Sequence, residues 1–226
     1  MLRQLLRNLA DNTNRNSFAV KLRKKRFLIF KSLIGNFLND EITILDVGGR
    51  EIYWEYMDFI KPNIHITLLN LEKEPTKYNN FISIIGDACN MSDFNDKSFE
   101  IIHSNSVIEH VGSFNDQMKM AAEVKRVGRS YFLQTPNYYF PMEPHFLIIG
   151  FQFMPVKMRA FIYRHWIKKT HDYEKSISVV KSIRLLKKKE LKQLFPNASI
   201  YREKIFGFTK SFIVYENFKP NKNGDS

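Results

Sequence analysis

The segment ITILDVGGREIYW, residues 42–54, decides how the fold of this chain is interpreted. Its first six residues are a short apolar run of the kind found in buried β-strands, and its last residues fit a helix. Two glycines, Gly48 and Gly49, stand at the change from strand to helix. Because glycine has no Cβ, a backbone at this point can approach a ligand closely. The segment predicts either a nucleotide or nucleoside cradle at the end of a first parallel strand, or a plain turn in an α/β core.

The same alternation continues along the chain. Further strands are predicted at residues 65–70, 81–87, 99–105 and 130–135, and helices at 51–60 and 115–127. Strands that are apolar on both faces and alternate with helices indicate a parallel sheet covered on both sides. The sequence therefore predicts a doubly wound, Rossmann-like α/β domain.

Both ends of the chain depart from this alternation. Residues 1–40 are expected to form an N-terminal helical leader, and 41–226 the main domain. In that domain, we expect 138–182 to be an inserted region of helices and loops without a clean strand. The last part is expected to contain a helix at 187–195, strands at 198–207 and 208–216, and a frayed tail at 220–226. These last two strands must pair antiparallel, because a parallel crossover needs about a dozen residues or more.

Composition narrows the class of protein. A chain of 226 residues can bury a full core, and its single cysteine, Cys89, cannot form an internal disulfide. No apolar run reaches the roughly 18 residues of a membrane span, and the first residues lack the pattern of a signal peptide. We therefore expect a cytoplasmic protein. The formal net charge of +12 predicts attraction to an acidic partner such as nucleic acid, anionic lipid or a phosphorylated substrate. Peripheral membrane contact through the basic, leucine-containing N-terminal helix is a further hypothesis.

Polar residues follow the predicted strands where each one ends. Asn70 and Glu72 follow the second strand, and Asp87 and Ala88 follow the third. The carboxyl ends of parallel strands share one edge of a sheet, which is where α/β folds bind ligands. The chain has neither G-x-G-x-x-G nor a P-loop, so pyrophosphate binding is disfavoured. The pattern favours a nucleoside without phosphates.

The segments ILDVGG, LLNLE, GDACNMS, FEIIHSNSVIEHVG and FLQTPN, taken together, resemble the class I S-adenosylmethionine-dependent methyltransferases, in particular the type 11 group of small-molecule methyltransferases. The resemblance covers about residues 40–137, and the two terminal strands also look like the end of that fold. It implies a seven-stranded sheet in the order 3-2-1-4-5-7-6 with strand 7 antiparallel. The implied cofactor is S-adenosyl-L-methionine, and the implied product is S-adenosyl-L-homocysteine.

The resemblance also implies which residues bind the cofactor, each named here by the part of the cofactor that it matches. The methionine part of the cofactor is expected to be held by Asp46, Gly48, Gly49, Asn105 and Ser106. The ribose is expected to be held by Asn70, with Glu72 close by, and the adenine by Asp87 and Ala88.

Two positions depart from the pattern of that family. Arg50 and Ile52 stand where the family has further glycines, and Asn70 stands where it has an acidic residue. Arg50 could instead pair with the cofactor carboxylate, which a glycine cannot do.

Two histidines are candidates for the base that takes a proton from the acceptor. His145 lies where the inserted region begins, and His110 lies in IEHV, at the expected start of a helix. Some ubiquinone-biosynthesis O-methyltransferases, which are similar around IEHV, bind a divalent metal with this patch, but Ser106 stands here in place of their first glutamate. Here only Glu109 and His110 of that patch remain, so we expect no required metal. Acceptor contacts are expected from Tyr138, Tyr139, Phe140 and Trp166.

These observations favour a methyltransferase that acts on a small-molecule, saccharide or lipid-linked acceptor, with oxygen as the expected methylated atom. The acceptor could be anionic. An RNA methyltransferase is a second interpretation, which the net charge favours, although the chain contains no NPPY-type motif or RNA-binding module. A binding or scaffold protein with a degenerate fold is a third. The oligomeric state is not predicted by the sequence.

Overall fold

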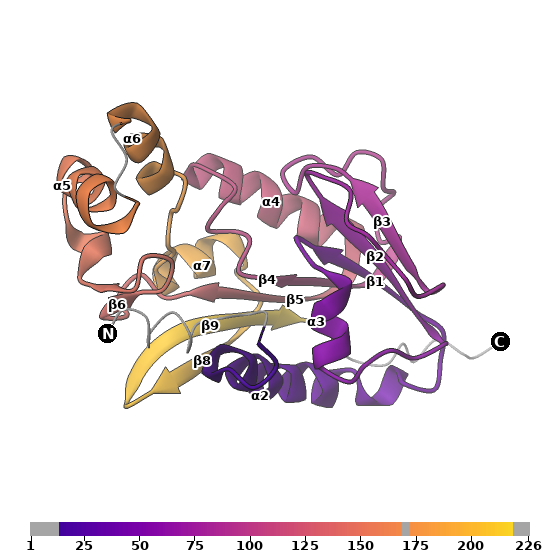
Figure 1. Cartoon of the computed structure of the whole chain (residues 1–226). Helices are drawn as coiled ribbons and strands as arrows, with labels where there is room; N and C mark the ends of the chain where they lie inside the picture. The colour runs from indigo at the N-terminus through magenta and orange to yellow at the C-terminus, as the bar shows by residue number, and fades with distance from the viewer. Residues whose placement is uncertain (1–13, 169–171, 219–226) are drawn as a thin grey trace. The chain divides into compact units, whose positions relative to one another are not determined.

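The computed structural model describes residues 14–168 and 172–218. Seven strands form one sheet in the order β3-β2-β1-β4-β5-β9-β8 (Figure 1), which confirms the predicted order 3-2-1-4-5-7-6. These strands are β1 (Ile42–Val47), β2 (Ile64–Asn70), β3 (Phe81–Ile85), β4 (Phe99–Asn105), β5 (Gly128–Pro136), β8 (Ser199–Ile205) and β9 (Phe208–Glu216). The helices include α2 (Phe18–Leu33), α3 (Glu51–Tyr56), α4 (Phe114–Val127), α5 (Val156–Ile162), α6 (Tyr173–Lys181) and α7 (Lys188–Leu194), with short 3-10 or π segments at Gly35–Phe37, Phe151–Phe153 and Tyr163–Ile167.

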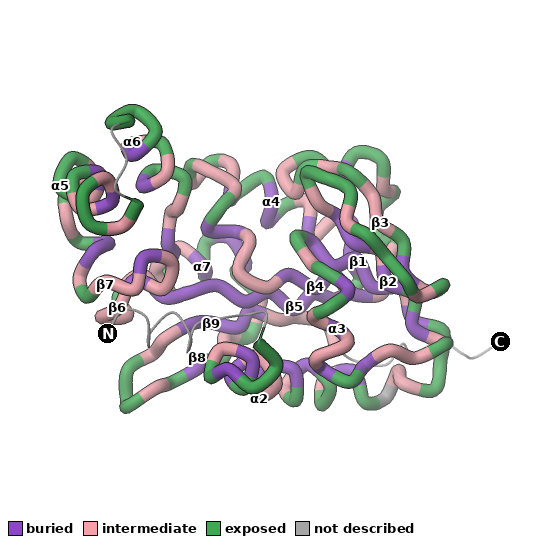
Figure 2. Tube along the Cα trace, viewed as in Figure 1, coloured by how far each residue is buried: buried purple, intermediate pink, exposed green. Residues whose placement is uncertain are grey.

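The strands β1, β2 and β4 are mostly buried, and β3 is more exposed (Figure 2). Their Ile, Val and Leu side chains suit a pleated surface that is covered on both faces. The pairing is parallel, with Val47 opposite Leu69 on one side and opposite Ser104 on the other, and with Asn70 opposite Ile85. The carboxyl ends of these four strands therefore lie in register along one edge of the sheet.

Helix α2 packs its aromatic face against this part of the fold. Ser17 caps the helix by accepting a hydrogen bond from the N–H of Val20 at 3.1 Å. The ring of Phe30 lies 6.1 Å from Trp54 and 5.2 Å from Phe132, measured between ring centroids. The leucines of the predicted leader at residues 2–9 lie outside the described residues.

Three local predictions were wrong in detail. Helix α3 ends at Tyr56 instead of residue 60, because Asp58 has φ of 52° and leaves the helical region. His110 does not begin a helix: α4 starts at Phe114, after Ser113 has formed reciprocal hydrogen bonds with Asp116. The inserted region, expected to contain no strand, includes the antiparallel pair β6 (Met142–Glu143) and β7 (Ile148–Ile149).

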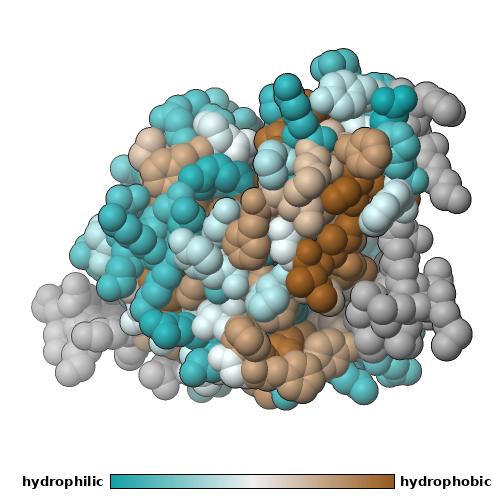
Figure 3. All heavy atoms as spheres, turned by 90° about the vertical axis from the view of Figure 1, so that its left-hand side faces the viewer, coloured by the Kyte–Doolittle hydropathy of each residue, from teal (hydrophilic) through white to brown (hydrophobic). Residues whose placement is uncertain are grey.

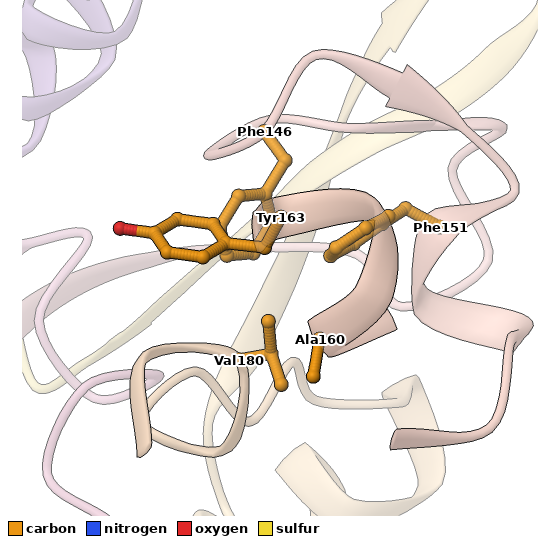
Figure 4. Close-up of a cluster of buried hydrophobic side chains, with 5 residues drawn as sticks. All are labelled: Phe146, Phe151, Ala160, Tyr163 and Val180. Carbon is orange, nitrogen blue, oxygen red and sulfur yellow. The ribbon is translucent and has the colours of Figure 1, made fainter. Parts of the chain in front are cut away.

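The described residues divide into two compact units. Unit 1 contains residues 14–105, 123–133 and 215–218, and unit 2 contains 106–122, 134–168 and 172–214. In unit 2, α5 and α6 lie side by side (Figure 1). Its hydrophobic core consists of Phe146, Phe151, Ala160, Tyr163 and Val180, whose side chains point toward one another (Figure 4).

Unit 2 also carries hydrophobic side chains on its surface, and Figure 3 shows such side chains among hydrophilic ones. The exposed hydrophobic residues of the inserted region are Tyr139, Ile149, Phe153, Met158, Phe161, Trp166 and Tyr173. Within residues 14–168 and 172–218, no helix combines the length and the apolar character needed to cross a bilayer. The aromatic and methionine residues of the insertion are therefore divided between the core of unit 2 and its surface.

Candidate cofactor and acceptor sites

The turn after β1 depends on both of its glycines. Gly48 has φ of 71°, a left-handed conformation that glycine adopts without strain, and its N–H donates to the carbonyl oxygen of Leu69 at 2.8 Å. A Cβ at Gly49 would lie 1.8 Å from Oδ2 of Asp46, far inside van der Waals contact. Gly49 is thus required because the Asp46 carboxylate fills the space beside it, and Gly48 because the chain turns there.

Asp46 faces inward from this turn. Its side chain is buried, and its two carboxylate oxygens are hydrogen-bonded to different partners: Oδ2 accepts from Nε1 of Trp54 at 2.8 Å, and Oδ1 lies 2.7 Å from Nδ1 of His103. The His103 ring also stacks on Phe132, with 4° between their planes. Asp46 therefore connects the end of β1 with the first turn of α3 and with His103. Neither of its oxygens is left free for a ligand at the edge of the sheet.

Asn70 stabilises the glycine turn from the neighbouring strand. Its side-chain Nδ2 donates to the carbonyl oxygen of Gly49 at 2.9 Å, and its own carbonyl accepts from the N–H of Gly86 at 2.8 Å. Asn70 is half-buried, and Glu72, two residues further on, is exposed. An amide can make this bond to a backbone carbonyl, whereas the carboxylate usual at this position has no N–H to donate. The departure at Asn70 thus has a structural reason.

Arg50 extends into solvent after the turn. Its Nε lies 3.2 Å from Oε1 of Glu74, and its side chain is 70% exposed. Ile52 is 44% exposed and lies on the first turn of α3. The two residues that replace family glycines therefore point partly or wholly away from the interior.

At the end of β3, Asp87 is exposed and Ala88 is half-buried. Oδ1 of Asp87 accepts a hydrogen bond from the N–H of Cys89 at 2.8 Å, which closes a short turn. The carboxylate is thereby held in a fixed orientation at the strand end. Glu72 and Asp87 are the two exposed carboxylates among the predicted cofactor residues.

Asn105 and Ser106 follow β4. Oδ1 of Asn105 accepts from Nη1 of Arg26 at 2.6 Å, so Arg26, which belongs to the basic segment at residues 21–26, has its side chain in the interior. Ser106 has φ of 61°, and both its N–H and its hydroxyl donate to Gln134, at 2.9 and 2.8 Å. These bonds hold the chain in a sharp turn directly after the strand.

Unit 2 holds a second cluster, which contains both candidate bases. Nδ1 of His145 lies 2.7 Å from Oε1 of Glu143, whose other oxygen accepts the backbone N–H groups of His145 and Phe146. Nε2 of His145 lies 4.0 Å from Oε1 of Glu109. The His110 ring stands edge-on to the His145 ring, with centroids 4.7 Å apart. Glu143 therefore fixes the ring of His145 and leaves its Nε2 as the nitrogen available for chemistry.

Glu109 is fully buried in this cluster. Its Oε2 accepts from the hydroxyl of Thr135 at 3.0 Å, and its Oε1 has no hydrogen-bond partner among the described residues. Burial raises the pKa of Glu109 to about 7, although the charge of His145 and several hydrogen bonds oppose the shift. This carboxyl group can therefore hold or release a proton near neutral pH.

The two histidines differ in basicity. Burial lowers the pKa of His145, but the hydrogen bond and charge of Glu143 and the charge of Glu109 outweigh it, so the net shift is upward. Burial and the positive charge of His145 lower the pKa of His110 to about 4, against the charge of Glu143. His145 is thus the stronger base of the pair, and His110 is neutral at physiological pH.

The fold brings one more possible metal ligand to Glu109 and His110 than the sequence indicated. Donor atoms of Glu109, His110 and His145 lie within 4.8 Å of one another, so the fold adds a third donor to the two that the sequence placed together. His145 comes from the inserted region, 35 residues after His110 in the chain. Among the other predicted acceptor residues, Tyr138 is half-buried and Tyr139 and Trp166 are exposed.

Sequence reasoning missed three functional supports: His103, Trp54 and Glu143. His103 and Trp54 looked like ordinary members of apolar elements, although a histidine in a buried strand is itself a signal that a partner exists. Glu143, in the segment PMEPHF, stands two residues before His145, a spacing that could have indicated a carboxylate–histidine pair.

Comparison with known proteins gives matches to part of the sequence. Residues 48–131 match the family described as "Methyltransferase domain". Two curated relatives, both uncharacterized proteins of Mycobacterium tuberculosis (strains CDC 1551 / Oshkosh and ATCC 25618 / H37Rv), are 39% identical over 64 residues. That match covers 28% of this chain and 22% of each relative, so it spans about a fifth of the relatives' length.

Solved structures share the fold over most of the chain. A methyltransferase from Aquifex aeolicus, described as SAM-dependent, is similar with a TM-score of 0.51 at 13% identity, over 94% of this chain and 96% of that chain. The 1,6-didemethyltoxoflavin-N1-methyltransferase of Burkholderia thailandensis, solved with 1,6-didemethyltoxoflavin and S-adenosylhomocysteine, has a TM-score of 0.52 at 12% identity, over 86% and 76%. The family match and the shared fold together confirm the resemblance on which the sequence analysis relied.

Proposed function

We propose that this chain, whose residues 48–131 match the methyltransferase domain family, catalyses methyl transfer from S-adenosyl-L-methionine. The acceptor is a small-molecule, saccharide or lipid-linked compound, the methylated atom is an oxygen, and the second product is S-adenosyl-L-homocysteine. One observation carries this proposal. The four strand ends of unit 1 lie in register along one edge of the sheet, where Gly48, Asn70, Gly86 and Asn105 stand at or directly after the last strand residues.

The residues at this edge fit a nucleoside that bears a methionine chain. Gly48 keeps the backbone open at the end of β1, and the exposed carboxylates of Glu72 and Asp87 can accept hydrogen bonds from ribose hydroxyls and from the adenine amine. Asn70, Ala88, Asn105 and Ser106 supply the neighbouring backbone. No cluster of lysines or arginines follows these strand ends, which agrees with a ligand that has no phosphates.

Arg50 is the group proposed to bind the cofactor carboxylate. It pairs with Glu74 in this structure, and both side chains lie next to the glycine turn. When the cofactor binds, Arg50 exchanges the carboxylate of Glu74 for the carboxylate of the cofactor, so its positive charge remains paired.

The bound cofactor supplies an activated methyl group on a sulfonium, so the protein has only to orient the acceptor and take its proton. We assign the proton transfer to Nε2 of His145. Glu143 holds the ring through Nδ1 and stabilises the imidazolium that forms, and the buried carboxyl of Glu109 lies 4.0 Å from Nε2, where its negative charge also favours the imidazolium. His110 contributes a neutral imidazole at the edge of the His145 ring.

We propose that the cluster acts without a required metal. Thr135 already donates to one oxygen of Glu109, and the raised pKa values of Glu109 and His145 indicate a site that holds protons. Glu109 and His145 are thus assigned to proton transfer.

Transfer of radiolabelled methyl groups tests the proposal. The full chain is incubated with labelled S-adenosyl-L-methionine and, in separate reactions, with pools of hydroxylated small molecules, saccharides and bulk RNA. We expect label in a small-molecule or saccharide pool, with a large loss in His145→Ala and normal activity in His65→Ala, an exposed histidine of unit 1 that serves as control. Label in RNA alone would establish an RNA methyltransferase, and cofactor binding without any transfer would indicate a scaffold.

A further inference from the structure

Unit 2 contains a cavity of about 280 Å³, close to the lower end of the range for small-molecule sites, which is about 300–1,000 Å³. Part of its wall is apolar and comes from Tyr138, Phe146 and Phe151. Two of these rings also belong to the hydrophobic core of the unit (Figure 4), so that this wall is held by packing. The remaining wall is polar and charged.

The cationic side chains around the cavity differ in whether they form an ion pair. Three cationic side chains line it: Arg159, Arg184 and Lys187. Arg184 is paired with Glu190 and also donates to Gln117 at 2.7 Å. Within residues 14–168 and 172–218, neither Arg159 nor Lys187 is paired with a carboxylate. The ammonium of Lys187 lies 5.0 Å from the centroid of the Tyr138 ring, and one guanidinium nitrogen of Arg159 donates to the carbonyl oxygen of Val180 at 3.3 Å.

The carboxylates of the cavity are already satisfied. Glu143 accepts three hydrogen bonds from His145 and Phe146, and Glu190 accepts from Arg184 and from the N–H of Lys187. The charge of Glu143 acts on Arg159, but three cations against two carboxylates leave the cavity with an excess of positive charge.

Two residues that line the cavity each have a buried side-chain atom without a partner among the described residues: Nε of Arg159 and Oε1 of Gln152. Gln152 is 8% exposed, and its Nε2 donates to the carbonyl oxygens of Tyr138 and Phe140 at 3.1 and 2.6 Å. These two bonds fix the amide, so Oε1 is held as an acceptor that lacks a donor. An unpartnered buried polar atom is unfavourable unless a ligand or water satisfies it.

We propose that this cavity is the acceptor-binding pocket and that it takes a small hydroxylated acid, whose carboxylate or phosphate binds Arg159 and Lys187 and whose hydroxyl donates to Gln152. This inference rests on the proposed function and specifies its substrate class. A volume of about 280 Å³ suits a small molecule better than a nucleic acid strand. Glu143 connects the pocket to the proposed base, because the same side chain lines the cavity and holds the ring of His145.

Calorimetric titration of the full chain tests the inference with two kinds of acid. The probes are 3-hydroxybenzoate as an aromatic acid and D-glucuronate as a sugar acid, each compared with a neutral analogue, 3-hydroxybenzyl alcohol and methyl glucoside. Benzoate, which lacks the hydroxyl, tests the contact with Gln152. We expect at least one acid to bind, its neutral analogue to bind at least tenfold more weakly, and, where that acid is 3-hydroxybenzoate, benzoate to bind more weakly as well. Comparison of the two acids identifies the aromatic or the saccharide class.

Variants separate the pocket from general attraction to a basic protein. Arg159→Met should weaken binding of the acid about 10- to 100-fold and leave the neutral analogue unchanged, and Lys187→Met should act in the same direction. Lys157→Met is the matched control, because Lys157 lies exposed on the same helix and does not line the cavity. Thermal denaturation verifies that each variant is folded, and Arg159→Lys, which keeps the charge, should retain more affinity than Arg159→Met.

The inference is overturned if neither acid binds better than its neutral analogue, or if Lys157→Met weakens binding as much as Arg159→Met does. Titration of the same samples with S-adenosyl-L-homocysteine distinguishes this failure from failure of the proposed function. Cofactor binding that persists while the acids do not bind would remove the pocket assignment alone. Loss of cofactor binding in the native chain would remove the proposed function itself.

Discussion

Replacement of Gly49 by alanine is expected to destabilise the protein by displacing the carboxylate of Asp46, which fills the space beside Gly49. The added Cβ would lie 1.8 Å from Oδ2 of Asp46, so that the carboxylate has to move. Movement of Asp46 breaks its hydrogen bonds with Trp54 and His103, which are 2.8 and 2.7 Å long. The ring nitrogens of both partners would then be buried without an acceptor.

The size of this effect follows from the two bonds. Leaving a buried donor unsatisfied costs about 1–3 kcal/mol, so two such donors give about 4 kcal/mol for Gly49→Ala. For a chain of this length, 1 kcal/mol lowers the melting temperature by about 2–4 °C, and the expected decrease is therefore about 8–16 °C. Differential scanning calorimetry measures it directly. Gly35→Ala is the control, because a Cβ at Gly35 meets no atom within 4 Å.

A double-mutant cycle tests the mechanism. Asp46→Ala alone should destabilise by a similar amount, since it removes the same acceptor from Trp54 and His103. With Asp46 already replaced, Gly49→Ala has no carboxylate to displace and should add little, so the two effects should not sum. Additive effects, or a neutral Gly49→Ala, would refute the explanation that Gly49 exists to accommodate Asp46.

Three further predictions concern the site. Glu143→Gln replaces the charged partner of His145 with a neutral one. Since Glu143 raises the pKa of His145, the acidic limb of the pH–rate profile should shift to lower pH, and an unchanged limb would argue against His145 as the base. Dialysis against EDTA should leave methyl transfer unchanged, whereas a loss that a divalent cation restores would assign a metal to Glu109, His110 and His145. Arg50→Met should weaken S-adenosyl-L-homocysteine binding and Glu74→Gln should strengthen it, each by about two- to fivefold as for an exposed ion pair; equal effects of the same sign would contradict the proposed exchange.

The sheet could be predicted because its signals are local. Each strand is a short apolar segment, and each is separated from the next by helical or turn residues, so order and direction followed from the alternation and the resemblance. The ends of helices were less predictable. Whether α4 begins near His110 or at Phe114 depends on hydrogen bonds between Ser113 and Asp116 that compete with several other possible starts.

The contacts inside the candidate sites could not be predicted, since they join residues far apart in sequence. Asp46 and His103 are separated by 57 residues, and Arg26 and Asn105 by 79. The segment DVGG gave no indication that its aspartate turns inward. Likewise, the inserted region brings His145 to Glu109 through a fold that its composition did not reveal.

The most direct test of the central claim is a calorimetric titration of the native chain with S-adenosyl-L-homocysteine. We predict a saturable heat of binding with one ligand per chain, an affinity at least tenfold lower in Asp87→Ala, whose carboxylate stands at the end of β3, and an unchanged affinity in Asp93→Ala, an exposed aspartate nearby. No heat and no rise in melting temperature at millimolar ligand would contradict the claim that the edge formed by the first four strands binds this cofactor.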